Sequence, residues 1–299
     1  MPDPAIVLGA NRYGKAEVRV VKVTRDTDRH EIDDLDVTSQ LSGDFAAAHL
    51  EGDNRNVVPT DTQKNTIFAF ARDGIGAPEE FLLRLADHFT SSFQCVTGGR
   101  WVAEQYAWTR IQAHGAEHEH AFVRTGQEVR TAVVVADGDD RHVIAGIQGL
   151  RVLKTTGAGF EGYPKDRYTT LAETRERILA TEVTARWRYG EAGVDYDAAY
   201  DAVRGLLLEA FADRFSTALQ ATLFDMGRRV LEERAEIAEI RFSMPNNHHF
   251  LVDLSPFGLD NPGEVFYAAD RPYGLIEAAV VREGVPSPAV AWEALAPFC

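Results

Sequence analysis

The order of the expected elements constrains the fold of this 299-residue chain more than any other feature. Each half is predicted to begin with a strand, to pass through a long excursion, and to continue with a strand, one or two helices, and two further strands. Helices inserted between antiparallel strand pairs are typical of an α+β fold whose antiparallel sheet carries its helices on one face. The acidic turn at 137–140 separates the halves, so we expect domains at 1–136 and 137–299.

Apolar runs and helical periodicity place these elements along the chain. The expected strands of the first half are 17–25, 66–71, 98–112 and 120–136, with a polar loop or hairpin at 26–56 and a helix that begins at Pro78. The expected elements of the second half are strands at 142–154, 179–189, 237–243 and 248–254, helices at 196–213 and 216–234, and a tail of short turns.

Net charge and cysteine usage restrict the partners and the compartment. The formal net charge is −15, which argues against nucleic acid and against an anionic membrane surface. An anionic substrate would have to be drawn in by local positive charge. Cys95 and Cys299 are too few and too distant for a disulfide framework, which favours a reducing cytosol. We expect neither a signal peptide nor a membrane span, because residues 1–15 lack a basic segment and a long apolar core and no apolar run approaches about 18 residues.

The stretch from 154 to 177 has the residue types of a pocket for a flat anion. Its glycines, among them Gly157 and Gly159, allow close approach of the backbone to a ligand. Phe160 offers a ring on which a planar ligand can stack. Arg177 offers two parallel hydrogen-bond donors to a planar anion. The same residues are equally compatible with a surface loop that leads into a strand.

Other polar stretches give further candidates, each with an ordinary structural alternative. Lys15 precedes the first strand and, if desolvated, can act as a base, although it can also be a solvated lysine. Thr60 and Asp61 are expected in a turn before a strand, where such residues commonly bond to their own backbone. Leu219 and Gln220 lie near the start of an amphipathic helix, where the amide can bind a heterocycle edge or simply face solvent.

The last candidates lie between two expected strands and in a histidine cluster. Asn246, Asn247, His248 and His249 exceed what a hairpin turn needs, and we interpret them as a polar site in which histidine can relay a proton. The histidines at 114, 118 and 120 suggest a metal site, but the neighbouring glutamates also fit an exposed acidic turn. We therefore expect no metal.

Taken in order, these stretches resemble the urate oxidase (uricase) family over nearly the whole chain. The motifs that carry the resemblance are YGKAEVRVVKVTR (13–25), VVPTDTQKNTIFAFAR (57–72), LKTTGAGFEGYPKDRYTTLAETRERILATEV (153–183), LQATLFDM (219–226) and PNNHHFLVDL (245–254). The resemblance implies two tunnelling-fold (T-fold) domains per chain and a homotetramer that encloses a tunnel, with active sites at subunit interfaces. It also implies oxidation of urate by O₂ to 5-hydroxyisourate and H₂O₂, without a cofactor.

For the substrate, the resemblance implies a role for each matching residue. Phe160 would stack on the purine, and Arg177 and Gln220 would bind its edges. Leu219 would offer a backbone contact, and Leu171 would form a wall of the pocket. These roles suit urate, which is planar, anionic and rich in amide-like donors and acceptors.

For catalysis, the resemblance implies a proton relay formed by Lys15, Thr60 and His248, with Lys15 as the base. Thr60 and Asp61 would reach the site from a neighbouring subunit, and Asn246 with Thr60 would hold O₂ or water above the ring. Asn247 stands where similar fungal proteins often have Lys, which changes the charge beside His248.

Two other functions remain open from the sequence. One is a purine- or pterin-binding T-fold protein without oxidase activity. The other is a metal-dependent T-fold enzyme that uses His114, His118 and His120. Turnover of urate by chelator-treated protein would distinguish both from the cofactor-independent oxidase.

Overall fold

The computed structural model describes residues 5–190 and 193–293. The chain forms two compact units, one of Met1–Ala145 with Pro286–Cys299 and one of Gly146–Val285. Both units combine antiparallel strands with helices, so the α+β class expected from the element order is confirmed. The boundary between two tandem domains at residue 137 stays a prediction.

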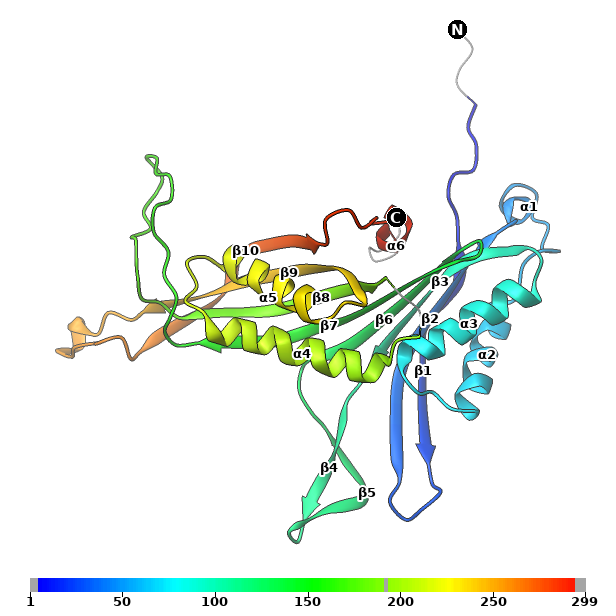
Figure 1. The fold of residues 1–299 in the computed structure, drawn as a ribbon, viewed down its shortest axis with the longest axis horizontal. Coiled ribbons are helices and arrows are strands. Elements are labelled where there is room, and N and C mark those ends of the chain that lie inside the picture. The colour runs from blue at the N-terminus through cyan, green and yellow to red at the C-terminus, as the bar shows by residue number, and fades with distance from the viewer. Residues whose placement is uncertain (1–4, 191–192, 294–299) are drawn as a thin grey trace. The chain divides into compact units, whose positions relative to one another are not determined.

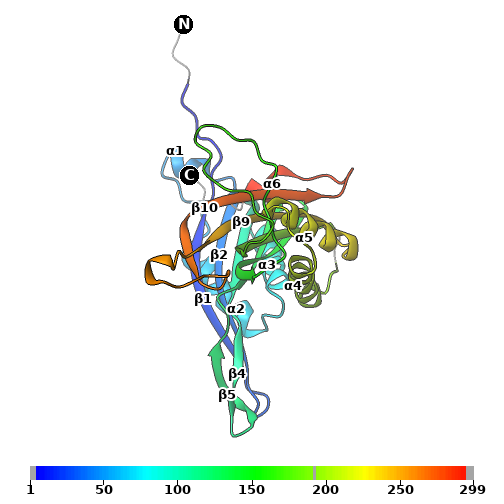
Figure 2. The same cartoon turned by 90° about the vertical axis from the view of Figure 1, so that its left-hand side faces the viewer.

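The first unit is built on strands in the order β1-β2-β3-β6-β7. Helix α2 packs on β1, and α3 packs on β3 and β6, so both helices cover the same sheet (Figure 1). A separate two-stranded hairpin, β4–β5, extends from this unit in both views (Figure 2). The elements are β1 (Tyr13–Thr24), β2 (Glu31–Gly43), α1 (Ala46–Leu50), α2 (Thr60–Arg72), α3 (Pro78–Ser92), β3 (Val96–Gln105), β4 (Trp108–Ala113), β5 (Ala116–Arg124), β6 (Val129–Asp137), the start of β7 (Asp140–Lys154) and α6 (Ala289–Glu293).

The core of the first unit follows from the two periodicities of its elements. Leu35, Val37, Ser39 and Leu41 alternate along β2 and have no exposed surface, as expected for one face of a strand. Helix α3 begins with Pro78 at a position where its missing N–H is not needed, as predicted. Its buried residues recur at helical spacing, and they are Pro78, Glu79, Phe81, Leu82, Leu85, Ala86 and Phe89.

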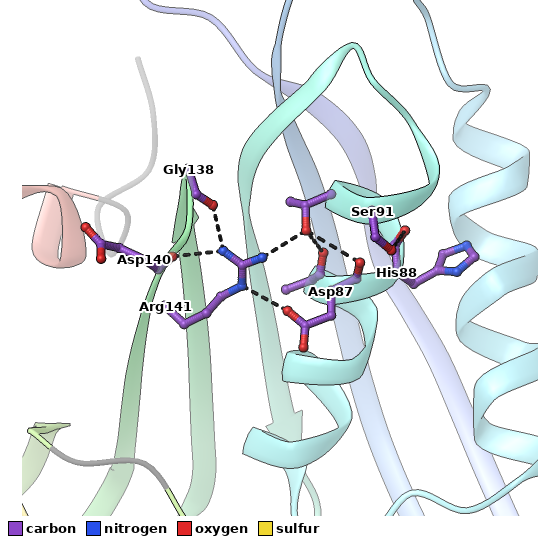
Figure 3. A network of polar contacts seen from close by, with 8 residues as sticks. Asp87, His88, Ser91, Gly138, Asp140 and Arg141 are labelled. Atoms are coloured by element: carbon purple, nitrogen blue, oxygen red, sulfur yellow. Dashed lines mark hydrogen bonds and ion pairs between the residues drawn. The ribbon is translucent and has the colours of Figure 1, made fainter.

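A single arginine ties the turn between β6 and β7 to helix α3 (Figure 3). Arg141 donates from Nη1 to the carbonyls of Gly138 and Asp140, at 2.9 and 3.0 Å. Its Nε donates to Asp87 Oδ1 at 3.0 Å, and its Nη2 donates to Thr90 Oγ1 at 2.9 Å. Residues 137–140 are therefore a fixed turn within the first unit.

The second unit is built on strands in the order β7-β8-β9-β10. Helices α4 and α5 lie side by side, and α5 packs on β9 and β10 (Figures 1 and 2). A Cβ added at Gly227 of α5 would lie 2.6 Å from Val280 Cγ2, so glycine permits this close packing. The elements are β8 (Leu179–Tyr189), α4 (Tyr196–Asp213), α5 (Leu219–Glu233), β9 (Ile237–Leu251), the 3₁₀ turn η1 (Ser255–Phe257) and β10 (Phe266–Val281).

The strand predicted at 66–71 is wrong, because this segment belongs to helix α2. The buried residues of α2 are Gln63, Ile67 and Ala71, which recur every four residues on one helical face. Within the apolar run, Ile67 and Ala71 therefore lie on the buried face of the helix, and the residues between them are more exposed. Consequently Thr60 and Asp61 begin a helix and do not form the expected turn.

The break predicted between strands at 237–243 and 248–254 is also wrong, because β9 runs unbroken from Ile237 to Leu251. Its neighbours β8 and β10 pair with it on both sides, which keeps it extended through Pro245. The register shifts instead on β10, between Ala269 and Gly274. The expected tail of short turns is likewise replaced by the 16-residue strand β10.

Candidate active site

A short glycine-containing loop holds together three segments of the second unit. Gly159 N donates to Ser216 O at 2.8 Å, and Ser216 N donates to Gly157 O at 2.8 Å. Arg177 N donates to Ala158 O at 2.9 Å. Gly157 has a φ of 73°, which a residue with a side chain rarely adopts. The loop therefore fixes the backbone just before α5 and just before β8 relative to Phe160.

Phe160 lies at the centre of this arrangement. Its backbone exchanges two hydrogen bonds with Thr174, at 2.7 and 3.0 Å. Its ring stacks on Tyr163 with a centroid distance of 4.8 Å and an interplanar angle of 13°. Arg177 Cζ lies 5.6 Å from the centroid of the Phe160 ring. The ring and the guanidinium singled out in the sequence are thus brought together.

Arg177 has unused hydrogen-bonding capacity. The side chain is half-buried, and its Nε is buried without a hydrogen-bond partner in the part of the chain that the structure describes. Burial lowers the pKa of Arg177 below its ordinary value, but the group stays charged near neutral pH. A half-buried cation with a free donor beside an aromatic ring is suited to bind a planar anion.

His248 lies close enough to Arg177 for their charges to interact. Burial lowers the pKa of His248 below 6.5, and the positive charges of Arg177 and His249 lower it further. The imidazole is therefore mainly neutral near pH 7 and can accept a proton. Asn246 pairs with Thr181 of β8, and this register carries His248 toward the end of β8 that follows Arg177.

His248 also borders a pocket of about 410 Å³ along β9 and β10. Its lining consists of Arg151, Glu182, Pro245, Asn247, His248, His249, Ala268, Ala269, Arg271 and Tyr273. Arg151 Nε lies 2.6 Å from Glu182 Oε2, so this cation is already paired. Phe160 and Arg177 do not line this pocket, and we assign the candidate site to their loop because the unused donor lies there.

Three further predicted site residues lie on the surface or at the edge of the region around Phe160 and Arg177. They are Leu171, Leu219 and Gln220. Leu219 is the first residue of α5 and is buried, whereas Gln220 is exposed. No side chain caps this helix start, which leaves backbone donors for another partner. The Leu171 side chain is 56% exposed, and its carbonyl accepts a hydrogen bond from the Tyr163 hydroxyl at 2.7 Å.

Lys15, Thr60 and Asp61 form a second group within the first unit. Thr60 begins α2, which packs on β1, and Lys15 pairs with Ser39 in the β1–β2 ladder. A Cβ added at Gly14 would lie 1.8 Å from Ser39 O, so only glycine allows this approach of the two backbones. A hydrogen bond from Lys64 lowers the pKa of Asp61, and Lys15 adds a smaller electrostatic contribution.

The sequence analysis missed several residues that contact or hold in place the residues it predicted. Tyr163 stacks on Phe160, and no pattern in the sequence singled out its ring. Ser216 anchors the glycine loop through its backbone, which leaves no side-chain signal. Gln63 is fully buried beside Ser39, and it becomes visible only when 60–72 is recognised as helical. The roles predicted for the site residues themselves stay predictions.

The three histidines considered as a metal site lie in and beside strand β5. The rings of His118 and His120 lie 4.6 Å apart on β5, but His114 occupies the turn before that strand. Within the described ranges, no group of three or more His, Cys, Asp or Glu side chains is arranged to hold a metal ion. Among the same residues, no helix is both long and apolar enough to cross a membrane.

The architecture is that of the tunnelling fold, with antiparallel sheets that carry helices. The family model for uricase matches residues 11–135 and 143–277. The chain is 62% identical to uricase of Arthrobacter globiformis over 294 residues, 98% of this chain and 96% of that protein. It is 37% identical to uricase of Danio rerio over 278 residues, 91% and 93% of the two chains.

A solved structure gives the same result. The crystal structure of uricase from Arthrobacter globiformis superimposes with a TM-score of 0.94 at 62% identity, covering 97% of this chain and 100% of that chain. The chain belongs to the uricase family and is an enzyme of the oxidoreductase class.

Proposed function

We propose that this enzyme is a cofactor-independent urate oxidase. The observation that carries the proposal is Arg177, a half-buried cation with a free Nε donor beside the Phe160 ring. Urate is a planar purine anion, so it can stack on the ring and accept hydrogen bonds from the guanidinium. Family membership supports the same substrate.

The remaining substrate contacts come from the surfaces around Phe160 and Arg177. Gln220 binds the purine edge with its amide, and the free backbone donors at the start of α5 supply the Leu219 contact. Leu171 forms a wall, and its position is set by Tyr163. Asn246, together with Thr60, holds O₂ or water over the ring.

Catalysis is a two-electron oxidation that balances without a prosthetic group. Urate loses a proton to Lys15, and the relay of Lys15, Thr60 and His248 moves protons between urate, oxygen and water. Two electrons pass from the purine to O₂, which takes up two protons and leaves as H₂O₂. Water then adds to the oxidised purine, giving 5-hydroxyisourate. His248 suits the relay because burial and Arg177 lower its pKa, which keeps a proton-accepting nitrogen available.

The active enzyme is proposed to be a cytoplasmic homotetramer of chains with tandem T-fold domains. Asp61, Leu171 and Gln220 are exposed in the single chain, which is expected if a neighbouring subunit completes each pocket. Thr60 and Asp61 then come from that neighbour. The family match is interrupted between 135 and 143, which supports domains at 1–136 and 137–299.

Chelator-treated protein provides the direct test of this activity. Incubation with urate in air should remove the ultraviolet absorbance of urate and release about one H₂O₂ for each urate consumed, as two-electron reduction of O₂ requires. Tight binding of urate without turnover would instead identify a purine-binding protein. Activity that disappears with the chelator and returns with a metal would contradict cofactor independence.

A co-expression experiment tests whether two chains share a site. Thr60→Ala and Arg177→Ala chains should each be inactive when alone. Random mixed assembly should restore about a quarter of wild-type activity, because one site in four receives both native residues. Absence of recovery in oligomers that contain both chains would show that each site is built from one chain.

A further inference from the structure

A buried glutamine in α2 has a hydrogen-bond donor that no group in the described residues uses. Gln63 and Ser39 both have no exposed surface, and Ser39 Oγ donates to Gln63 Oε1 at 2.9 Å. Gln63 Nε2 is buried and has no hydrogen-bond partner. Because an unused buried donor is costly, its retention calls for a partner or a role.

The strand register places Lys15 opposite Ser39, the residue to which this amide bonds. Lys15 pairs with Ser39, and paired residues of an antiparallel ladder project from the same face. Ser39 bonds to Gln63 of α2, so this face of the ladder is turned toward α2, and we infer that the Lys15 side chain projects toward the helix. Gln63 lies one helical turn after Thr60 and bonds to Ser39, the cross-strand neighbour of Lys15.

Two titratable groups near Lys15 already take part in hydrogen bonds. Asp61 on α2 accepts hydrogen bonds from Lys64 and Asn65, so its carboxylate is already engaged. Tyr13 on β1 donates its hydroxyl to Val58 O. The amide nitrogen of Gln63 can only donate, and among the forms of a lysine side chain only the unprotonated amine can accept.

We propose that Gln63 is a positioning residue for Lys15. Its Nε2 donates to the unprotonated amine, while Ser39 fixes the orientation of the amide. This contact favours the form of Lys15 that accepts a proton from substrate and directs its lone pair. The role rests on the proposed function, in which Lys15 is the base.

Gln63→Met and Gln63→Glu test the proposal together. Methionine keeps the volume but removes the donor, so kcat for urate should fall roughly 2- to 12-fold, the effect of one neutral hydrogen bond. KM should stay within about twofold, and Tm should be unchanged or higher, because an unpaired buried polar group is removed. Glutamate should lower kcat further than methionine, because a carboxylate holds Lys15 as the ammonium ion.

A matched control and the wild type separate the possible outcomes. Gln112→Met makes the same change on exposed β4 and should leave kcat, KM and Tm unchanged. An unchanged kcat in Gln63→Met, or a smaller loss in Gln63→Glu than in Gln63→Met, would overturn the positioning role. A lower Tm with KM and kcat changed in parallel would show that Gln63 is only structural. Failure of wild-type protein to oxidise urate would instead contradict the proposed function.

Discussion

The two groups of candidate residues are held by different kinds of structure. Lys15 lies on strand β1, directly before a shift in the β1–β2 register, and Thr60 is the first residue of helix α2. Phe160 and Arg177 lie outside the long elements. Phe160 exchanges backbone hydrogen bonds with Thr174, and Arg177 N donates to Ala158 O. A proton acceptor needs one well-placed atom, whereas a flat ligand needs a ring and several donors around it. The irregular loop supplies this second arrangement.

The two groups also differ in how their charges are used. In the first group, Asp61 is paired with Lys64, and the Gln63 amide has a buried donor without a partner among the described residues. In the second group, the Arg177 Nε is unpaired and its charge acts on His248. Substitutions in the first group should therefore change turnover, and those in the second should change binding.

The largest expected effect is that of Lys15→Met. Removing a general base typically costs 10²- to 10⁴-fold, so kcat should fall by about this factor. KM should change little, because Lys15 is not assigned to substrate binding. Steady-state kinetics over a range of urate concentrations measures both. Lys22→Met, on the same strand, is the matched control and should retain wild-type kinetics.

Arg177→Ala should show the opposite pattern. A hydrogen bond to a charged group contributes roughly 1.5–3 kcal/mol, so urate affinity should fall about 10- to 150-fold. Arg175→Ala is the control, because Arg175 is exposed and pairs with Glu161 at 3.0 Å. Equilibrium binding without O₂ measures the affinity. Wild-type affinity in Arg177→Ala would remove Arg177 from the site, and the contrast between the two groups would be lost.

The pH dependence of stability provides a further test of the second group, because it depends on the charge state of His248. Its pKa is lowered in the folded chain, so the unfolded chain takes up this proton at higher pH. The contribution of neutral His248 to stability is therefore present above about pH 6.5 and is lost as pH falls through the folded pKa. Tm should fall less on acidification from about pH 7 to 5 in His248→Asn than in the wild type.

The pKa of His248 also tests whether its charge interacts with that of Arg177. Arg177→Ala should raise the His248 pKa only partly toward its ordinary value, because burial is the larger cause of the shift. An NMR titration of the His248 ring protons measures the change. An unaltered titration curve in Arg177→Ala would show that the two side chains do not interact.

The smallest expected effect is that of Tyr163→Phe, which keeps the ring stacked on Phe160 and removes the hydroxyl bonded to Leu171 O. Loss of one neutral hydrogen bond costs about 0.5–1.5 kcal/mol, so urate affinity should fall roughly 2- to 12-fold. Tyr163→Leu should lose more, because stacking adds about 0.5–1.5 kcal/mol. A larger loss in Tyr163→Phe than in Tyr163→Leu would contradict this assignment.

The sequence predicted the elements whose periodicity is uninterrupted. β8 and α4 match their predicted bounds of 179–189 and 196–213, because each is long and has one consistently buried face. The sequence analysis failed at α2, because a short apolar run fits both the helical and the strand period. It also failed at Pro245, because strands β8 and β10 pair with β9 on both sides and keep this proline within a strand.

The candidate site shows the same limit. Phe160 and Arg177 could be singled out by residue type, because rings and guanidinium groups have few substitutes in binding a flat anion. The hydrogen bonds that fix them come from backbone atoms of Gly157, Ala158 and Ser216, which carry no side-chain signal. The unused Gln63 donor depends on a helix that the pattern did not predict.

The most direct test is a crystal structure of the enzyme with a urate analogue that cannot be oxidised. Our account predicts that the purine lies parallel to the Phe160 ring, with its edge bonded to Arg177 Nε and with Thr60 and Lys15 at the same ligand. An analogue bound elsewhere, for example in the pocket lined by Arg151 and Arg271, would contradict it.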